Sequence, residues 1–275
     1  MRSSRRLLAV PAAVTLAWAL AACGGGAAPA AEGLSPAPVE TTSEAAAPET
    51  PETAEITAAN FVETIAGAQQ SAGSYDFTMT MSAAGQTISA TGSAQLTDTP
   101  EVAMSMEYPG AGSMEMRLVD SVMYMNMGEA TGGKFLQIDP TDPSNPLSAS
   151  FSEMTGDLDP TKGMAGQQAA IVSVEKAGEP EQLDGVAAQP YQVVIDPSKI
   201  EGPQRDAIDQ AAAAGVALPA TFEYTFWIGP DGLARKMAFD LLGSQTEMTF
   251  SNWGAGAPIV APTADQITTE DPFAA

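Results

Sequence analysis

The sequence predicts an α+β fold in which an antiparallel β-sheet of about ten strands, apolar on one face, is covered by a few helices. Two observations support this prediction. Apolar and polar residues alternate in one segment after another from residue 74 onward, which is the pattern of strands with one buried side. Three short segments have apolar spacing or flanking residues typical of helices. A sheet of this many twisted strands is also expected to curl.

The first of the three helices is predicted in the segment TAANFVETIAGAQQ. Apolar residues recur there at helical spacing, namely Phe61, Val62, Ile65 and Ala66. Gly73 follows, and glycine commonly ends a helix. The apolar stripe of this helix is expected to cover part of the sheet.

Six strands are predicted directly after this helix. In the first, SYDFTMTMS, polar residues share one face and apolar residues share the other, namely Tyr75, Phe77, Met79 and Met81. The segments QTISATGSAQL, EVAMSMEY and SMEMRLV repeat the alternation. SVMYMNM is apolar on both faces, and KFLQID completes the group. Because these strands follow one another closely, neighbours are expected to pair antiparallel.

The second half of the domain mixes helices and strands. An apolar stripe predicts a second helix at Leu147, Phe151, Met154 and Leu158. AIVSVEK and YQVVID are predicted strands, and PQRDAIDQAAAAG, with proline near its start and glycine after its end, is the third predicted helix. The segment TFEYTFWIGPDGLARKMAFDLL predicts a hairpin whose turn contains Asp231-Gly232, and SQTEMTFSNW predicts the closing strand.

The N-terminus has the layout of a secretory leader. Three arginines precede an apolar run from residue 7 to residue 20, which is too short for a membrane-spanning helix. The run leads into Leu20-Ala21-Ala22-Cys23, which resembles a bacterial lipobox and contains the only cysteine of the chain. The resemblance implies that the thiol of Cys23 receives a diacylglyceryl group and that this residue becomes the first of the mature protein. The alternative is a stray cysteine in a leader that is discarded.

Composition divides the chain into three regions. Residues 1–22 are expected to be a signal peptide of the lipoprotein type, with both the Sec and the twin-arginine export routes open. Residues 23–55 are expected to be the lipidated cysteine followed by a disordered acidic tether rich in Pro, Ala and Glu. Residues 56–275 are long enough for a single domain with a sizeable core.

The chain is strongly acidic. Without the predicted leader it has eight basic and 34 acidic residues, which gives a formal charge of −26. A protein of this charge is not expected to bind the phosphates of nucleic acids. It is also repelled by an anionic lipid surface, which favours a domain held away from the membrane on its tether. Alternatively, the acidity serves only to keep the protein soluble.

Several kinds of active site are excluded by residues that the chain lacks. It contains no histidine, which excludes the common serine and cysteine triads and histidine-ligated zinc. The acidic segments at residues 139–145 and 157–160 lack the central glycine and terminal glutamate of a calcium loop and are interpreted as turns and helix caps. A carboxylate pair suited to glycoside hydrolysis cannot be singled out among 34 acids. We therefore expect no catalytic residue, no metal ion and no cofactor, and we do not expect an enzyme.

Methionines are concentrated in the early strands. Thirteen lie beyond the initiator, and nine of these fall in four strands between residues 79 and 127. Methionine is unbranched and polarisable, so a wall built of it can adapt to acyl chains of variable shape. The candidate residues for the lining of such a cavity are Phe77, Met79, Met81, Met104, Met106, Met114 and Met116.

Two alternatives to a lipid cavity stay open for these methionines. They can fill an ordinary core, since methionine is a common gap-filler. Their thioethers can also bind a soft metal such as Cu(I), an interpretation that no histidine or second cysteine supports.

The lipobox, the acidic tether and the strands from SYDFTMTMS to VMYMNM occur in one order with LDGVAAQPYQVVID, the hairpin FWIGPDGLARKM and the terminal FSNWGAGAPIVAPTADQI. Together these features resemble actinobacterial lipoproteins of the LppX/LprG type, over nearly all of the chain from Cys23. The resemblance implies a fold similar to the LolA/LolB lipoprotein carriers. That fold is a strongly curved, unclosed antiparallel sheet, or half-barrel, with helices capping the concave face and an apolar cavity that takes acylated lipids.

We therefore expect a lipoprotein, anchored by lipid to the outer face of the bacterial cell membrane, that binds or transfers acylated lipids in an apolar cavity. Its expected partners are an acylated lipid ligand and the membrane, and not nucleic acid. The alternative is a non-transporting sensor or interaction module that binds a protein of the cell envelope. A cavity too small for an acyl chain would favour that alternative.

Overall fold

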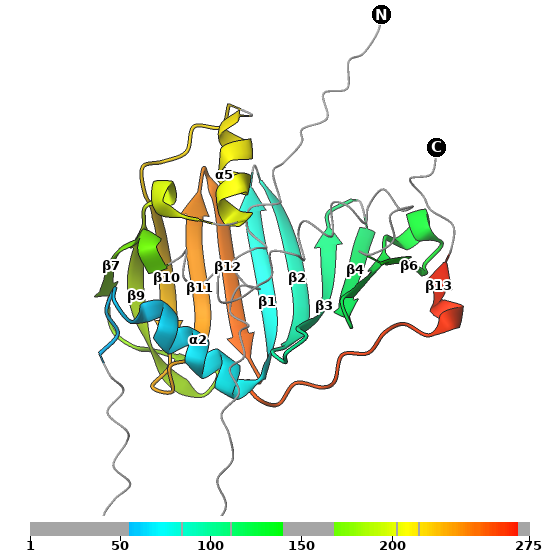
Figure 1. The fold of residues 1–275 in the computed structure, drawn as a ribbon, viewed down its shortest axis with the longest axis horizontal. Coiled ribbons are helices and arrows are strands. Elements are labelled where there is room, and N and C mark those ends of the chain that lie inside the picture. Colours follow the sequence, from blue (N-terminus) through cyan, green and yellow to red (C-terminus); the bar gives the residue numbers. More distant parts are fainter. Residues whose placement is uncertain are drawn as a thin grey trace, which may run out of the picture.

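A computed structural model describes residues 55–83, 85–110, 112–139, 168–201, 203–213 and 215–268. Residues 1–54, which include the predicted leader, Cys23 and most of the tether, lie outside the described residues, and so does the helix predicted at residues 147–158. The described residues form one large sheet together with the helices α2 (Phe61–Ala72) and α5 (Pro203–Ala213), both of which the sequence predicts (Figure 1).

Thirteen strands form the sheet. In chain order they are β1 (Ser74–Ala83), β2 (Gln86–Gln95), β3 (Glu101–Tyr108), β4 (Gly112–Val119), β5 (Val122–Asn126), β6 (Phe135–Ile138), β7 (Ile171–Lys176), β8 (Glu181–Leu183), β9 (Val186–Ile195), β10 (Phe222–Ile228), β11 (Ala234–Leu241), β12 (Ser244–Ser251) and β13 (Ile267–Thr268). Single-turn 3-10 helices lie at η2 (Gly128–Thr131), η3 (Pro197–Lys199) and η4 (Ala264–Gln266).

The strands are arranged in the order β13-β6-β5-β4-β3-β2-β1-β12-β11-β10-β9-β7, and β8 pairs with β9. Among the described strands every pairing is antiparallel except the parallel pair of β13 and β6. The sheet is unclosed, with β13 and β7 as its two described edges, and it curves into a half-barrel (Figure 1). The predicted α+β half-barrel is confirmed, with thirteen strands in place of about ten.

One face of this sheet is apolar and carries the core. Helix α2 lies across it, in front of the strands from β9 to β1, and we call this side the inner face (Figure 1). Phe61 and Ile65 of α2 belong to the same buried cluster as Met104 of β3 and Val193 of β9, which come from distant parts of the sheet. Ile208 of α5 belongs to the cluster as well. Burial of this cluster stabilises the fold by about 25 cal/mol for each Å² of apolar surface removed from water.

The boundaries of α2 follow from its flanking residues. Before the helix, the side-chain Oδ1 of Asn60 accepts a hydrogen bond from the backbone N–H of Thr57 at 2.7 Å. After it, Gly73 has a left-handed φ of 76° and donates its N–H to the carbonyl of Gln69 at 3.1 Å. Glycine adopts this conformation without the steric penalty of a side chain, so the helix ends there as predicted. Strand β1 begins at the next residue, which leads the chain directly into the centre of the sheet.

The predicted hairpin is formed by β10 and β11. Its turn is closed by the N–H of Gly229, which donates to the carbonyl of Leu233 at 2.9 Å. Asp231 Oδ1 accepts from the N–H of Leu233 at 3.1 Å, and Gly232 has a φ of 76°. The Asp-Gly pair therefore occupies the turn that its sequence indicated.

Three strand features differ from the prediction. Strands β8 and β13, with three and two residues, were not predicted. Strand β9 begins at Val186, although the predicted strand began at Tyr191, and it includes Pro190. The carbonyl of Pro190 accepts from the N–H of Ala177, on the side of β7 and β8. The backbone nitrogen of Pro190, which carries no hydrogen, faces the same side. The pairing with β7 ends at Tyr191 and that with β8 begins at Ala188, so the proline interrupts no ladder bond.

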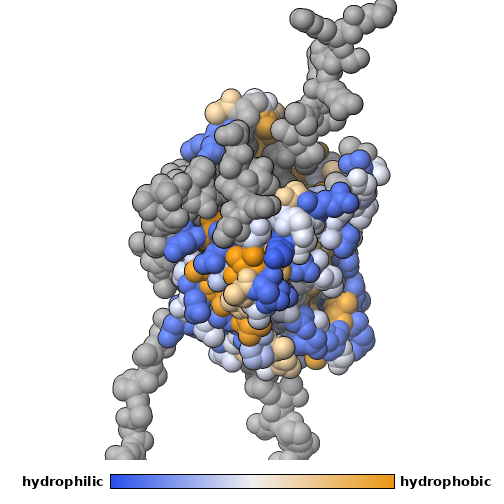
Figure 2. Space-filling view, turned by 90° about the vertical axis from the view of Figure 1, so that its right-hand side faces the viewer, coloured by the Kyte–Doolittle hydropathy of each residue, from blue (hydrophilic) through white to orange (hydrophobic). Residues whose placement is uncertain are grey.

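A C-terminal strap, residues 252–266, connects β12 in the centre of the sheet with β13 at its edge. Gln95 Nε2 donates to the carbonyl of Ala257 at 2.8 Å, and Arg117 Nη1 donates to the carbonyl of Val260 at 3.2 Å. Ile259 is buried in a cluster of residues that alternate with the inner-face residues and so lie on the opposite, outer face: Val119, Tyr124 and Phe135. The side of the molecule that contains β6 and β13 shows apolar residues among hydrophilic ones (Figure 2).

Candidate functional site

Strand register places the methionines of the inner face in a row. Six directly opposed residues cross β4, β3, β2, β1, β12 and β11, and we call them the methionine row: Met114, Met106, Ala90, Met79, Met248 and Met237. Phe226 of β10 and Tyr191 of β9 continue it. Directly opposed side chains of a sheet lie about 5 Å apart, so the row is a continuous strip of neighbouring side chains.

A second row runs parallel to the first, two residues further along each strand. It crosses β5, β4, β3, β2, β1 and β12, and its members are Met125, Met116, Met104, Gly92, Phe77 and Phe250. A Cβ atom on Gly92 would come within 2.5 Å of Phe77 Cζ, because the phenyl ring lies over this glycine. The ring therefore fills the inner-face space that a larger residue at position 92 would take.

The structure places all seven predicted lining residues on the inner face. Five of them are buried, with exposed fractions between 4% and 9%: Phe77, Met79, Met81, Met104 and Met106. Met114 and Met116 are half-buried and pack against the same cluster. Strand alternation therefore predicted the face of these residues correctly. That they line a cavity for lipid stays a prediction.

Sequence analysis did not single out Met237 and Met248 as lining residues, although both belong to the methionine row. They come late in the chain, and the pairing of β1 with β12 brings Met248 beside Met79. Met237 then lies opposite Met248 through the pairing of β11 with β12. Alternation in the sequence indicated the face of these two residues, but no local pattern indicated their neighbours.

Aromatic residues dominate the part of the inner face near α2. Phe61 of α2 meets Phe226 edge-on with ring centroids 5.3 Å apart, and the rings of Tyr224 and Phe239 are 5.0 Å apart. Burial raises the pKa of the Tyr224 hydroxyl far above its usual value, and burial also raises the pKa of Tyr191. Both phenols are therefore neutral at physiological pH, which keeps this part of the face free of phenolate charge.

One buried cation lies at the start of β11. The side chain of Arg235 is 5% exposed, and its Nη2 donates to Asp231 Oδ2 at 2.5 Å. Its Nε and Nη1 atoms find no hydrogen-bond partner among the described residues. Gly232 of the same turn approaches Ala68 of α2. A buried charge without its partner is costly. The ion pair between Arg235 and Asp231 therefore holds this turn in its position beneath α2.

The two rows can contact alkyl chains but offer little to a polar substrate. Their members carry thioethers, phenyl rings, a methyl group or no side chain, and none carries a charge or a strong hydrogen-bonding group. Among the described residues no group of three or more His, Cys, Asp or Glu side chains is arranged to hold a metal ion. Within the same parts of the chain, no helix is both long and apolar enough to cross a membrane.

Solved structures of mycobacterial lipoproteins have a similar fold. The lipoprotein LppX from Mycobacterium tuberculosis matches with a TM-score of 0.50 and 13% sequence identity, over 74% of this chain and 98% of LppX. This chain has the LppX fold. LprF from Mycobacterium bovis matches with a TM-score of 0.49 and 18% identity, over 75% of this chain and 97% of LprF. The predicted resemblance to the LppX/LprG lipoproteins is confirmed at the level of the fold. No protein-family model matches the sequence, and no curated protein sequence matches it.

Proposed function

We propose that this protein is an extracytoplasmic lipoprotein, held on the outer face of the cell membrane by an acylated Cys23, that binds an acylated lipid against its inner face and carries it. The observation that carries the proposal is the pair of apolar rows on the inner face, which together cross seven strands. The LppX fold and the lipobox sequence support it.

The energetics of such a transfer are favourable when the chain never enters water. Each methylene exposed to water costs about 0.8 kcal/mol, so a free lipid with long acyl chains does not leave a bilayer readily. Moving the chain from the bilayer to an apolar protein face replaces one apolar medium by another, and the net cost is small. Helices α2 and α5, which both contribute to the inner-face cluster, would act as the cover that keeps the bound chain from water.

Methionine suits this role because its side chain has three rotatable bonds and no branch. Five of the six members of each row are methionine or phenylalanine. A wall of this kind changes shape by rotamer changes rather than by strand movement, so it can accept acyl chains that differ in length or unsaturation.

Native mass spectrometry tests the proposal on protein produced without residues 1–23. We expect the purified protein to carry a lipid that is released on unfolding. Protein refolded after removal of the lipid should take up a lipid again from vesicles. Preparations that carry no lipid, and that extract none from vesicles after refolding, would overturn the carrier function. The remaining candidate would then be a non-transporting sensor or interaction module.

A further inference from the structure

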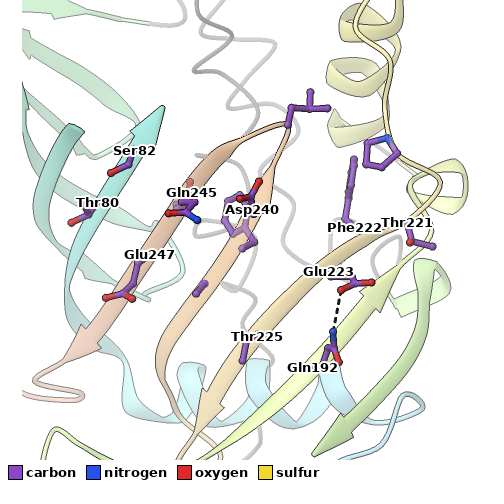
Figure 3. A pocket seen from close by; sticks show the side chains of 15 residues that line it. Thr80, Ser82, Gln192, Thr221, Phe222, Glu223, Thr225, Asp240, Gln245 and Glu247 are labelled. Atoms are coloured by element: carbon purple, nitrogen blue, oxygen red, sulfur yellow. Dashed lines mark hydrogen bonds between the residues drawn. The ribbon is translucent and has the colours of Figure 1, made fainter. Parts of the chain in front are cut away.

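A groove of about 860 Å³ lies on the outer face of the sheet, on the side away from α2 and from the methionine row. Figure 3 shows this face, with α2 passing behind the strands. Most of the residues of β1, β12, β11, β10 and β9 that line the groove point outward, and Phe222, Phe239 and Thr246 of the inner-face alternation also border it. One end is bounded by Pro219 and Thr221, which precede β10, and by Leu242 in the turn between β11 and β12.

Strand register arranges polar side chains across this floor. One row consists of Gln192, Thr225, Ala238, Glu247 and Thr80, each directly opposite the next. In the adjacent row, Gln245 lies between Asp240 and Ser82. Hydroxyl, amide and carboxylate groups therefore repeat at the spacing of neighbouring strands, about 4.8 Å.

The three carboxylates of the groove already have partners. Glu247 Oε2 pairs with Lys236 Nζ at 2.8 Å, and Glu223 Oε2 accepts from Gln192 Nε2 at 3.0 Å, the bond drawn in Figure 3. Asp240 Oδ1 accepts from the N–H of Gly243 at 3.1 Å. Each carboxylate keeps further lone pairs for a ligand hydroxyl. Among the described residues a cation compensates the charge of Glu247, whereas the donors to Glu223 and Asp240 are neutral.

Three further polar groups of the groove are available for a ligand. The hydroxyls of Thr80 and Thr225 and the amide of Gln245 make no hydrogen bond to another described residue. Among the described residues that line the groove there is no basic side chain, which disfavours phosphate and other anions. Leu242, 59% exposed at the bounded end, offers an apolar contact beside these groups.

We propose that this outer groove binds a neutral, polyhydroxylated ligand, namely a short segment of a glycan. Sugar hydroxyls donate to carboxylate and amide oxygens and accept from amide and hydroxyl donors, and the groove presents these groups in two rows. The C–H face of a sugar ring is apolar and matches the exposed leucine. Because the groove and the methionine row lie on opposite faces of the sheet, this binding is independent of lipid carriage.

Saturation-transfer difference NMR tests the proposal with the purified full-length protein and neutral trisaccharides of glucose, mannose, galactose and arabinose. We expect saturable transfer to at least one trisaccharide, with a Kd on the order of 1 mM, because an exposed groove leaves much of the ligand in water. Gln245→Ala and Thr225→Val each remove one hydrogen-bonding group and should weaken binding about threefold.

Thr91→Val is the matched control. It makes the same change on the same face of the sheet, in β2, outside the groove. We expect this variant to bind the trisaccharide as the parent does. Equal weakening by the control, or no saturable transfer to any of the four trisaccharides, would overturn the proposal. Salt-sensitive binding of pentalysine without binding of a trisaccharide would likewise overturn it and identify the groove as a cation site.

Discussion

Met106 is the residue chosen to distinguish a cavity lining from a packed core. It lies in the methionine row, opposite Ala90 on one side and Met114 on the other. At 9% it has the largest exposed fraction of the five buried candidates, and the hydroxyl of Tyr108 donates to its Sδ at 3.5 Å. The sulfur of Met106 therefore has a polar neighbour. A substitution that increases the side-chain volume at this position distinguishes a cavity lining from a packed core.

Met106→Trp adds volume at this point of the row. If the row lines a cavity, the added ring takes empty space, so we expect loss of bound lipid with little change in the free energy of unfolding. In a packed core the same substitution would cost about 1–3 kcal/mol. Denaturation midpoints and native mass spectra of variant and parent measure both effects.

The control for this substitution is Ser105→Trp, which adds the same ring on the outer face of the same strand. It should leave lipid binding unchanged. A Met106→Trp protein that is markedly destabilised, from a parent that never carries lipid, would contradict the assignment of these residues to a lipid cavity.

Tyr224 gives a prediction for alkaline pH. Its pKa in the folded protein is raised by burial, whereas in the unfolded chain it is about 10. The neutral phenol is therefore favoured by folding, and this contribution is complete below about pH 10 and lost as the pH rises toward the folded pKa. We expect Tyr224→Phe to reduce the fall in unfolding free energy above pH 10.

Urea denaturation at a series of alkaline pH values measures this effect. Tyr108→Phe is the control, because Tyr108 is half-buried and the same atom is removed. It measures what removal of a phenol hydroxyl does at a less buried position of the same sheet. An alkaline fall that Tyr224→Phe does not change would show that other groups, and not this buried phenol, cause it.

At the scale of secondary structure elements, the sequence predicted what depends on local pattern. The alternation in SYDFTMTMS and EVAMSMEY indicated both the strands and their buried faces, because the two-residue period of a strand is a local property. The Asp-Gly turn and the C-terminal end of α2 were likewise indicated by residues with strong local preferences. Strands β8 and β13 were missed, since two or three residues are too few to show a period.

The arrangement of the candidate site was beyond sequence reasoning for a different reason. Membership of the methionine row depends on register between strands that lie far apart in the chain, above all the pairing of Met79 with Met248. The outer groove depends on the same pairings read on the other face. Register is set by the whole sheet, so alternation predicted the faces of these residues but not which of them lie side by side.

The C-terminal strap is an element whose function is structural. It covers the outer face near β6 and inserts Ile259, which is 8% exposed, between the side chains of that cluster. β13, which follows the strap, forms with β6 the one parallel pair among the described strands, and it covers the edge of β6. The strap therefore holds the open arm of the half-barrel from outside.

Ile259→Ala should loosen this arm. We expect a loss of about 2 kcal/mol in unfolding free energy, because a large buried side chain is truncated. Amide hydrogen exchange should become faster in β6 and β13 while exchange in β10 changes little. Val260→Ala is the control, since Val260 follows Ile259 directly and its side chain is 64% exposed. This variant should change neither the unfolding free energy nor the exchange rates. Uniformly faster exchange throughout the sheet would instead show that the strap stabilises the molecule as a whole.

At the scale of the whole molecule, the chain enters the domain on the inner-face side. Ile56, next to the predicted tether, is buried in the same cluster as Phe61 and Met104. The negative charge of Glu55 acts on Tyr191, which continues the methionine row. A lipid anchor at Cys23 would therefore connect to the side of the domain that is proposed to hold lipid, while the outer groove lies on the opposite face.

The last prediction concerns this anchor. Cys23→Ala removes the only thiol of the chain, and with it the acceptor for a diacylglyceryl group. We expect the variant to take no label from a fatty-acid analogue in growing cells and to be either uncleaved or released from the membrane. Ala22→Gly keeps the cysteine and a small residue before it, so this control should still be labelled. Because lipid binding is assigned to the inner face, released Cys23→Ala protein should still carry lipid in native mass spectra. Label on Cys23→Ala would show that the lipobox assignment is wrong, and lipid lost together with the anchor would show that the two roles are not separate.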